Sequence, residues 1–575
     1  MKRSFAALAL ASLGLAACAD DTPTEVAAPA AKAPTDPSSY VAPYMPGRVI
    51  VRFASGSQPM AGPVSGRMGG VQRMVEEFGA EAERPMLLSR TYVLSVEPGT
   101  EAEVAASLSE EEGVEFAEPD FMITLIPCET GDCADPTDFF LARKWDLHNT
   151  GTVTLANAAP VATGRADADM DWIEAYDALG PAPAGTARIG IVDSGIRDTH
   201  VELAGRVVAA RNFATGYPAT LVEDRDGHGT HVAGIAGARG VSASGVAYSE
   251  GIQFINAKAC ERYLFADGIV RTSCPTSSSS DAIVWATDQG ANVINLSLGG
   301  NPTATAGSAV QQAALQYARS KNVLPFCATG NDNYFQIAFP ARFPECIAVG
   351  ATNWADARSS YSNYGAGTEI AAPGGDGGAG FPLGLILSLS NSSNTTYSYK
   401  SGTSMATPQV AGLAALLFSQ GVGDDEAVLA RIKATADDLG TPGEDNVFGA
   451  GRINVCRALN PAQLTVTMPG AFNRTSNGVF TVIIYNVTGF DPSKLDEADL
   501  RLSDGSAGGA GVALKGDDYR SALVDADGDG DLDLQVKFNR PEMAAAVASG
   551  STQLVIRGNV GCRRVEGSQA VNVLR

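Results

Sequence analysis

Five apolar runs constrain the fold of this chain more than any other feature of its sequence. They are "ARIGIVD", "GIQFINAKA", "NVINLSL", "VLPFCATG" and "CIAVGA". Helical patterns lie between them, such as the one that contains Val310, Ala313, Ala314 and Tyr317. Continuous apolar strands that alternate with helices are typical of a parallel sheet covered by helices on both faces. The sequence therefore predicts an α/β fold for residues 138–459.

A smaller unit is expected before this region, in residues 47–125. Val71 and Phe78 belong to one helical face, and Val104 and Leu108 indicate a second helix between strand-like stretches. The order strand-helix-strand-helix-strand predicts a compact α+β module.

The pattern changes again near residue 460. Short strand-like runs separated by turn residues predict an all-β, sandwich-like domain over residues 460–575. Residues 126–137 form a connector between the first two units. The net charge of −23 argues against nucleic acid as a partner, since a phosphate backbone binds to a basic surface.

The N-terminus has the pattern of a targeting segment. "MKRSFAALALASLGLAAC" places Lys2 and Arg3 before an apolar stretch that is too short to span a bilayer. It resembles a bacterial lipoprotein signal, residues 1–17, in which Cys18 is lipidated and residues 18–46 form a flexible tether. The protein is then exported and anchored to a bacterial membrane, or released outside the cell. An ordinary secretory signal that is cut near Ala17 is the alternative.

Eight of the nine cysteines follow Cys18, and an even number in an exported chain indicates disulfides. Proximity in the sequence pairs Cys128 with Cys133, Cys260 with Cys274, Cys327 with Cys346, and Cys456 with Cys562. A zinc site is not expected, because the chain has no CxxC pair and only four histidines.

Three separated stretches carry residues that could take part in catalysis. Asp193 ends the apolar run "RIGIVD", His228 lies between glycines in "DGHGTHVAG", and Ser404 opens the helical pattern of "GTSMATPQVAG". A serine hydroxyl is a weak nucleophile unless an imidazole takes its proton, and the imidazole needs a carboxylate to fix its tautomer. The order Asp, His, Ser is one of the known orders of such a triad.

These stretches resemble those of the subtilisin-like (subtilase) serine peptidases, with the greatest similarity to the proteinase K branch. Four further stretches support the resemblance: "NVINLSLGG", "ATGNDN", "FPARFPECIAVGAT" and "AAPG". The resemblance covers residues 138–459 and implies that Asp193 orients the imidazole, His228 is the general base and acid, and Ser404 is the nucleophile. It implies no cofactor for catalysis.

The resemblance also assigns roles around the triad. Asn331 would donate its side-chain amide to the oxyanion, together with the backbone N–H of Ser404. A strand of Ser297, Leu298 and Gly299 would pair with an extended polypeptide substrate. In the family the proline that matches Pro340 can follow a cis bond. His231 in H-x-x-H is expected to be structural, since no third metal ligand is evident.

Residues 47–125 resemble an inhibitor-type propeptide, which would occupy the cleft until the precursor cuts itself between about 123 and 140. A permanent interaction domain is the alternative. The expected function is a self-processing serine endopeptidase that acts as a monomer. The alternative from another class is a surface binding protein with a latent peptidase scaffold.

A possible calcium loop lies in the C-terminal domain. In "DADGDGDLD", Asp525, Asp527, Asp529 and Asp533 occupy positions 1, 3, 5 and 9 of a calcium-binding loop. Val536 stands where an EF-hand has its glutamate. The loop therefore departs from the EF-hand, and an acidic hairpin turn is the alternative to structural calcium.

Overall fold

The structure is a computed structural model, and it describes most of the chain after residue 43. The described residues are 44–55, 78–125, 131–133, 144–153, 161–162, 164–179, 185–241, 243–265, 268–377, 384–459, 462–487, 491–505, 511–513, 521–561 and 563–574. The predicted signal peptide and residues 18–43 of the predicted tether, including Cys18, lie outside them, whereas residues 44–46 belong to β1. No helix among the described residues is long and apolar enough to cross a membrane.

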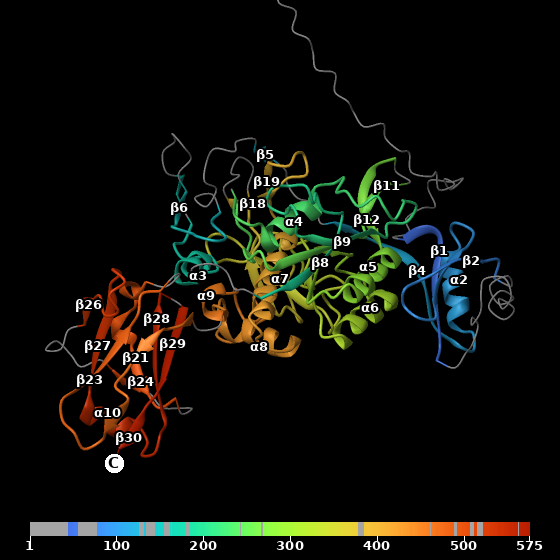
Figure 1. Cartoon of the computed structure of the whole chain (residues 1–575). Coiled ribbons are helices and arrows are strands. Elements are labelled where there is room, and N and C mark those ends of the chain that lie inside the picture. The colour runs from blue at the N-terminus through green and yellow to red at the C-terminus, as the bar shows by residue number, and fades with distance from the viewer. Residues whose placement is uncertain are drawn as a thin grey trace, which may run out of the picture.

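A seven-stranded parallel sheet forms the centre of the molecule, as predicted (Figure 1). Its strands, in spatial order, are β17 (Ile370–Pro373), β16 (Ile347–Thr352), β15 (Leu324–Ala328), β13 (Val293–Leu296), β8 (Ala187–Asp193), β10 (Ile252–Lys258) and β9 (Val207–Asn212). Because side chains alternate along a strand, neighbouring residues of β8 enter different cores: Ile191 packs into one apolar cluster and Val192 into the other. Both faces of the sheet are therefore buried.

Helices cover the two faces of this sheet. α4 (His228–Gly237) and α7 (Thr403–Ser419) contribute to the core that contains Ile191. α5 (Thr276–Asp288) and α6 (Ala309–Ser320) contribute to the core that contains Val192. α4 and α7 approach closely, since a Cβ added to Gly412 of α7 would lie 2.5 Å from the carbonyl oxygen of Ala236. The predicted α/β fold is confirmed.

The remaining helices of this unit lie at its periphery. They are α3 (Trp172–Leu179), α8 (Asp425–Thr435) and α9 (Val455–Ala458). A three-stranded sheet joins β18 (Ile386–Leu389), β19 (Tyr397–Lys400) and β5 (Gly131–Cys133), and β6 (Thr152–Val153) pairs with β7 (Val161–Ala162). The predicted connector thus contributes a strand, β5, which pairs antiparallel with β19.

The N-terminal unit places its strands in a sheet that continues into the unit built around the central parallel sheet. The strands are β1 (Tyr44–Phe53), β2 (Glu81–Pro85), β3 (Thr91–Ser95) and β4 (Val114–Leu125), covered by α2 (Glu101–Ser109). Val104 and Leu108 of α2 are buried, as expected, whereas the helix predicted at Val71 lies outside the described residues. β4 pairs on one edge with β12 (Val270–Pro275), which forms a hairpin with β11 (Glu261–Leu264).

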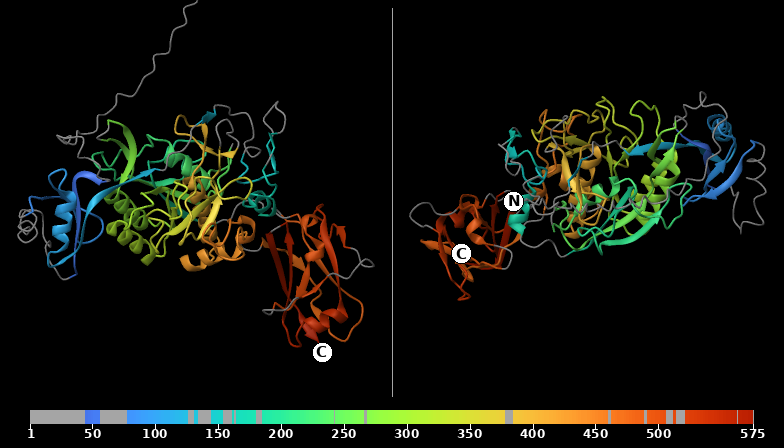
Figure 2. Two further views of the ribbon diagram at one scale, coloured as in Figure 1. Left: turned by 180° about the vertical axis from the view of Figure 1, so that it is seen from behind. Right: turned by 90° about the horizontal axis from the view of Figure 1, so that it is seen from above.

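The C-terminal unit is a sandwich of two sheets around one apolar core, as predicted (Figure 2). One sheet holds β25 (Val512–Ala513), β24 (Arg501–Ser503), β28 (Gln553–Val560), β29 (Arg563–Ala570) and β20 (Ala462–Gln463). The other holds β21 (Val466–Thr467), β23 (Val479–Ile484), β27 (Asp533–Asn539) and β26 (Ala522–Val524). β22 (Ala471–Asn473) pairs with β30 (Asn572–Leu574), and α10 (Arg540–Ala546) follows β27.

Two predicted disulfides are present, Cys260–Cys274 and Cys327–Cys346. Cys456 is disulfide-bonded as well. Its predicted partner Cys562 lies outside the described residues, as does Cys128, so those two pairings stay predictions. The peptide bond between Phe339 and Pro340 is cis, which matches the expectation from the resemblance.

Candidate active site

The carboxyl end of β8 delivers Asp193 to the edge of the parallel sheet, where functional side chains gather in such folds. The side chain is fully buried. Its Oδ1 accepts a hydrogen bond from the backbone N–H of Ser194 at 2.7 Å. The Nδ1 atom of His228 lies 2.9 Å from Oδ1 and 3.0 Å from Oδ2. A carboxylate in this position fixes the tautomer of the imidazole and stabilises its protonated form.

His228 is the first residue of α4, and a buried carboxylate organises the turn before it. Asp224 accepts hydrogen bonds through Oδ1 from the N–H groups of Asp226 and Gly227, and through Oδ2 from the N–H and hydroxyl of Thr230. The hydroxyl of Ser194 donates to Asp224 at 2.9 Å. Asp224 therefore ties the end of β8 to the start of α4. We did not single it out from the sequence, although an aspartate just before a helix is a capping signal.

Ser404 is the second residue of α7, on the same face of the sheet as α4. Its Oγ donates to the carbonyl of Ser297 at 3.0 Å, and the hydroxyl of Ser297 donates to the carbonyl of Ser404 at 2.8 Å. Helix N-termini present unpaired N–H groups and the positive end of the helix dipole. Ser404 thus stands where developing negative charge is stabilised.

Asn331 follows β15 and faces the N-terminus of α7. Its Oδ1 accepts from the N–H and the hydroxyl of Thr403, both at 2.9 Å, which orients the amide. A Cβ added to Gly402 would lie 2.9 Å from Asn331 Nδ2 and 3.6 Å from the backbone nitrogen of Ser404. Two donors therefore border one small space beside the serine, as an oxyanion site requires.

The predicted substrate strand is β14, Leu298–Gly299, and it is paired in this structure. It lies antiparallel to β4, with Leu298 opposite Leu125 and Gly299 opposite Thr124. On its other edge β4 pairs with β12, with Ser273 opposite Thr124. In Figure 1 the end of β4 enters the green body of the molecule from the blue unit. A segment of the chain itself thus occupies the place of an extended polypeptide between two strand edges.

His231 has a structural position. Its Nε2 lies 3.0 Å from the carbonyl of Ser398, and complete burial lowers its pKa well below the ordinary value. Among the described residues it belongs to no cluster that could hold a metal ion.

The structure brings three of the four predicted calcium ligands together. Carboxylate oxygens of Asp525, Asp527 and Asp529 lie within 4.8 Å of one another and are exposed. Asp533 is buried, and its two oxygens accept the N–H groups of Asn486 at 2.9 Å and Ala526 at 2.8 Å. The three exposed carboxylates could share a cation, whereas Asp533 fastens the base of the loop.

A second acidic cluster, which was not predicted from the sequence, lies near α3. Oxygens of Asp169, Asp171 and Glu174 lie within 4.8 Å of one another at the start of α3. Burial, with the neighbouring carboxylates, raises the pKa of Asp171 to about 6 and that of Glu174 to about 7. Acidic residues at a helix start are common, so no sequence signal separates this cluster from an ordinary capped helix.

Comparison with known proteins places the chain in a class and a family. Residues 185–451 match the model of the "Subtilase family". The "Thermophilic serine proteinase" of Bacillus sp. (strain AK1) is 31% identical over 420 residues, which cover 72% of this chain and 88% of that protein. "Thermitase" of Thermoactinomyces vulgaris is 36% identical over 287 residues, 50% of this chain and 93% of that protein. The chain is a serine endopeptidase by class, and it belongs to the subtilase family.

A solved structure agrees on the fold. The epidermin leader peptide processing serine protease of Staphylococcus aureus has a TM-score of 0.51 to this chain at 20% identity, and the match covers 72% of this chain and 97% of that one. At this identity the likeness supports the fold alone.

Removal of the Asp224 carboxylate should loosen the turn that carries His228. We expect Asp224→Ala to lower kcat for a peptide p-nitroanilide with little change in KM, and to lower the free energy of unfolding by about 1–2 kcal/mol. Asp224→Asn, which keeps one acceptor oxygen, should retain part of both. Urea unfolding and steady-state kinetics on the purified variants measure these effects. Equal kcat values for wild type and Asp224→Ala would show that the turn holds His228 without it.

The raised pKa of Glu174 predicts a pH-dependent stability. Its pKa shifts from 4.5 to about 7, so the folded state keeps a proton that the unfolded state releases as pH rises through this window. Stability from this group is therefore lost as pH rises through that window. Glu174→Gln should be more stable than wild type at pH 8 and equal to it near pH 4, as measured by thermal unfolding. The matched change at exposed Glu223, in the same unit, should give no such difference, and an equal pH dependence in both variants would contradict the prediction.

Proposed function

We propose that the protein is an exported serine endopeptidase that is made as a self-processing precursor. The observation that carries the proposal is the contact between Asp193 and His228, beside helix α7, which has Ser404 in its first turn. Ser404 attacks the scissile carbonyl while His228 takes its proton, and Asp193 stabilises the imidazolium. The amide of Asn331 and the N–H of Ser404 bind the oxyanion. His228 then protonates the leaving amine, and water releases the acyl group.

The pairing of β4 supports the role of residues 47–125 as an intramolecular inhibitor. Glu118 accepts hydrogen bonds at the N-terminus of α6, from the hydroxyl of Ser308 and the N–H groups of Ala309 and Val310. Asp120 accepts from the N–H and the hydroxyl of Ser277 at the start of α5. The strand thus caps two helices of the catalytic unit with its carboxylates while its end fills the cleft.

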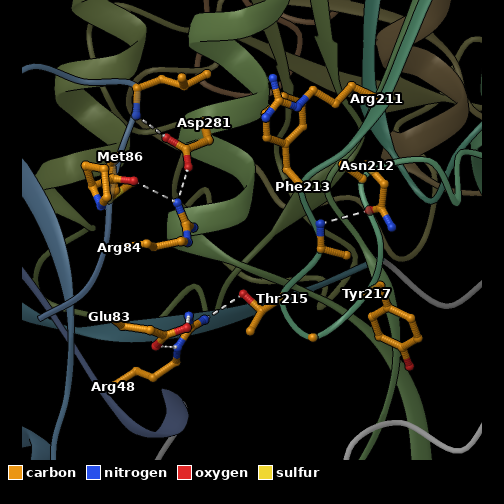
Figure 3. Close-up of a pocket in the computed structure, with 15 residues that line it drawn as sticks. Arg48, Glu83, Arg84, Met86, Arg211, Asn212, Phe213, Thr215, Tyr217 and Asp281 are labelled. Atoms are coloured by element: carbon orange, nitrogen blue, oxygen red, sulfur yellow. Dashed lines mark hydrogen bonds and ion pairs between the residues drawn. The ribbon is translucent and has the colours of Figure 1, made fainter. Parts of the chain in front are cut away.

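Charged side chains extend this interface around a cavity of about 390 Å³ (Figure 3). Arg84 Nη1 lies 2.6 Å from Asp281 Oδ2, and the N–H of Leu87 donates to Asp281 Oδ1 at 2.7 Å. Arg48 pairs with Glu83 and donates to the hydroxyl of Thr215. Met86 and Leu88 of the N-terminal unit also pack in one apolar cluster with Ile283 of α5, so the interface combines polar and apolar contacts. Its polar contacts are those expected of an interface that has to separate, and they favour a propeptide over a permanent interaction domain.

The positions of β4 and β5 narrow the range of residues in which the maturation cut is proposed to fall. β4 ends at Leu125 on β12 and β14, whereas β5 begins at Gly131 on β19, the strand that precedes Ser404. A cut between them separates the two docked strands, and we place it between Leu125 and Gly131. This range lies inside the 123–140 window expected from the sequence.

The remaining assignments rest on the sequence. Lipidation at Cys18, the membrane anchor and export follow from the N-terminal pattern, and the proteinase K-like branch follows from the motifs. Calcium is proposed as a structural ion at Asp525, Asp527 and Asp529, whose oxygen donors suit a hard cation. The rival function is a surface binding protein with a latent peptidase scaffold, and the first experiment below separates the two.

The nucleophile is tested by Ser404→Ala in the full-length chain. We expect the purified variant to keep residues 47–125 attached, whereas wild type yields a mature chain whose N-terminus falls between residues 126 and 131, as intact-mass measurement would show. A fluorophosphonate probe should label mature wild type at Ser404. A Ser404→Ala chain that matures without added protease would refute self-processing, and unlabelled, uncut wild type would favour the latent scaffold.

The ion pair between Arg84 and Asp281 gives a test of propeptide docking. Arg84→Glu should weaken the non-covalent complex of the cut chains on the order of 10²-fold, because it leaves a buried carboxylate facing a like charge. Size-exclusion chromatography at stepped NaCl concentrations measures the dissociation. Adding Asp281→Arg should restore the complex by reversing the pair. Arg90→Glu is the control, since Arg90 contacts Glu115 within the same unit; an equal effect of both single variants would contradict the prediction.

A further inference from the structure

The β11–β12 hairpin extends the sheet that holds β4, and it continues past the catalytic serine. β12 runs antiparallel to β4, with Pro275 opposite Met122 and Ser273 opposite Thr124. Continued by one residue, this register places Thr272 level with Leu125, so the residues of β12 that precede Thr272 lie beyond the carboxyl end of β4. Ser404 is hydrogen-bonded to Ser297, the residue before the one that pairs with Leu125, so it stands at that same end. The outer part of the hairpin thus lies on the side of the scissile bond that carries the leaving segment of the substrate.

The hairpin is anchored firmly at its base. The disulfide Cys260–Cys274 ties its two strands together at the base. The hydroxyl of Tyr217 donates to the carbonyl of Arg262 at 2.6 Å, and the hydroxyl of Tyr263 donates to the carbonyl of Thr215 at 3.2 Å. The hydroxyl of Thr272 donates to Asp226, two residues before His228. In Figure 1 the anchored ribbon rises above α5 at the edge of the molecule.

The far part of the hairpin exposes apolar side chains to solvent. Leu264 is 70% exposed and Val270 is 43% exposed, and the two residues face each other across the strands. Cross-strand partners share a face, and so do residues two apart, so this pair lies on the same face as Thr272. Neighbouring Ile269 is 53% exposed. The contacts at the base of the hairpin hold this apolar face beside the segment of His228. An exposed apolar face in such a place is typical of a surface that contacts another chain.

We propose that the Leu264–Val270 face is a substrate-binding surface for apolar residues on the leaving side of the scissile bond. The inference rests on the proposed endopeptidase function. Its occupant is the polypeptide substrate, because the face continues the sheet in which β4 already lies as an extended chain. Burial of apolar side chains against it strengthens binding of substrates whose leaving segment is hydrophobic.

The experiment compares substrates that differ only after the scissile bond. Two quenched fluorescent peptides share one acyl side, identified from a peptide library, and carry Leu-Phe-Val or Ser-Asn-Gly on the leaving side. Mature wild type should cleave the apolar peptide with a kcat/KM about tenfold higher, mainly through KM. Leu264→Thr with Val270→Thr keeps strand-forming residues and should abolish that preference. It should leave hydrolysis of a p-nitroanilide unchanged, since that substrate has no leaving-side residues.

The control variant is Val241→Thr, which makes the same kind of change at a residue 59% exposed beyond the C-terminal end of α4. It should keep the preference. Wild type without a preference, or a double variant that retains it, overturns the inference. Sedimentation with phosphatidylglycerol vesicles tests a membrane as the alternative occupant. A double variant that keeps the substrate preference but no longer sediments with the vesicles would assign the face to a membrane and overturn the inference. Failure of wild type to hydrolyse the p-nitroanilide would instead count against the endopeptidase function.

Discussion

The buried carboxylate of Asp193 is the constraint on which the rest of the site depends. An ionised group without solvent is costly unless it is hydrogen-bonded and faces a partner that can carry positive charge. The N–H of Ser194 and the ring of His228 supply both conditions. For His228 to reach this position, α4 has to begin directly beside the carboxyl end of β8. The five hydrogen bonds to Asp224 from Ser194, Asp226, Gly227 and Thr230 hold that junction together.

The attraction of helix N-termini for negative charge is used on both faces of the sheet, for a different purpose on each. On one face, His228 and Ser404 lie in the first turns of α4 and α7, and the N-terminus of α7 borders the proposed oxyanion site. On the other face, α5 and α6 receive their capping carboxylates from Asp120 and Glu118, which belong to the N-terminal unit. Separation of that unit would remove these carboxylates from both helices at once, although α6 keeps Ser308 as its own N-cap.

The sequence was informative where local chemistry decides the structure. The apolar runs predicted the central sheet, the short alternating runs predicted the sandwich, and proximity predicted the bond between Cys260 and Cys274. The sequence did not predict contacts between segments that lie far apart along the chain. The pairing of β5 with β19 joins residues that lie shortly before Ser404 to a segment that the sequence predicted as a connector. No local pattern distinguishes the four aspartates of the C-terminal loop. All four accept hydrogen bonds from backbone N–H groups, yet only Asp533 is buried.

The cleft is defined by two strand edges with room for one chain between them. In the described residues, β14 pairs only with β4, while β12 pairs with β4 and β11. Neighbouring strands lie about 4.8 Å apart, so withdrawal of β4 leaves two edges separated by about 10 Å. Unpaired edges bind an extended backbone whatever its side chains. A helix, about 10 Å wide with its side chains, has no free N–H or C=O groups to offer and does not fit. Under the proposed function this geometry favours locally unfolded polypeptide as substrate, and β4 and a substrate strand would compete for one place.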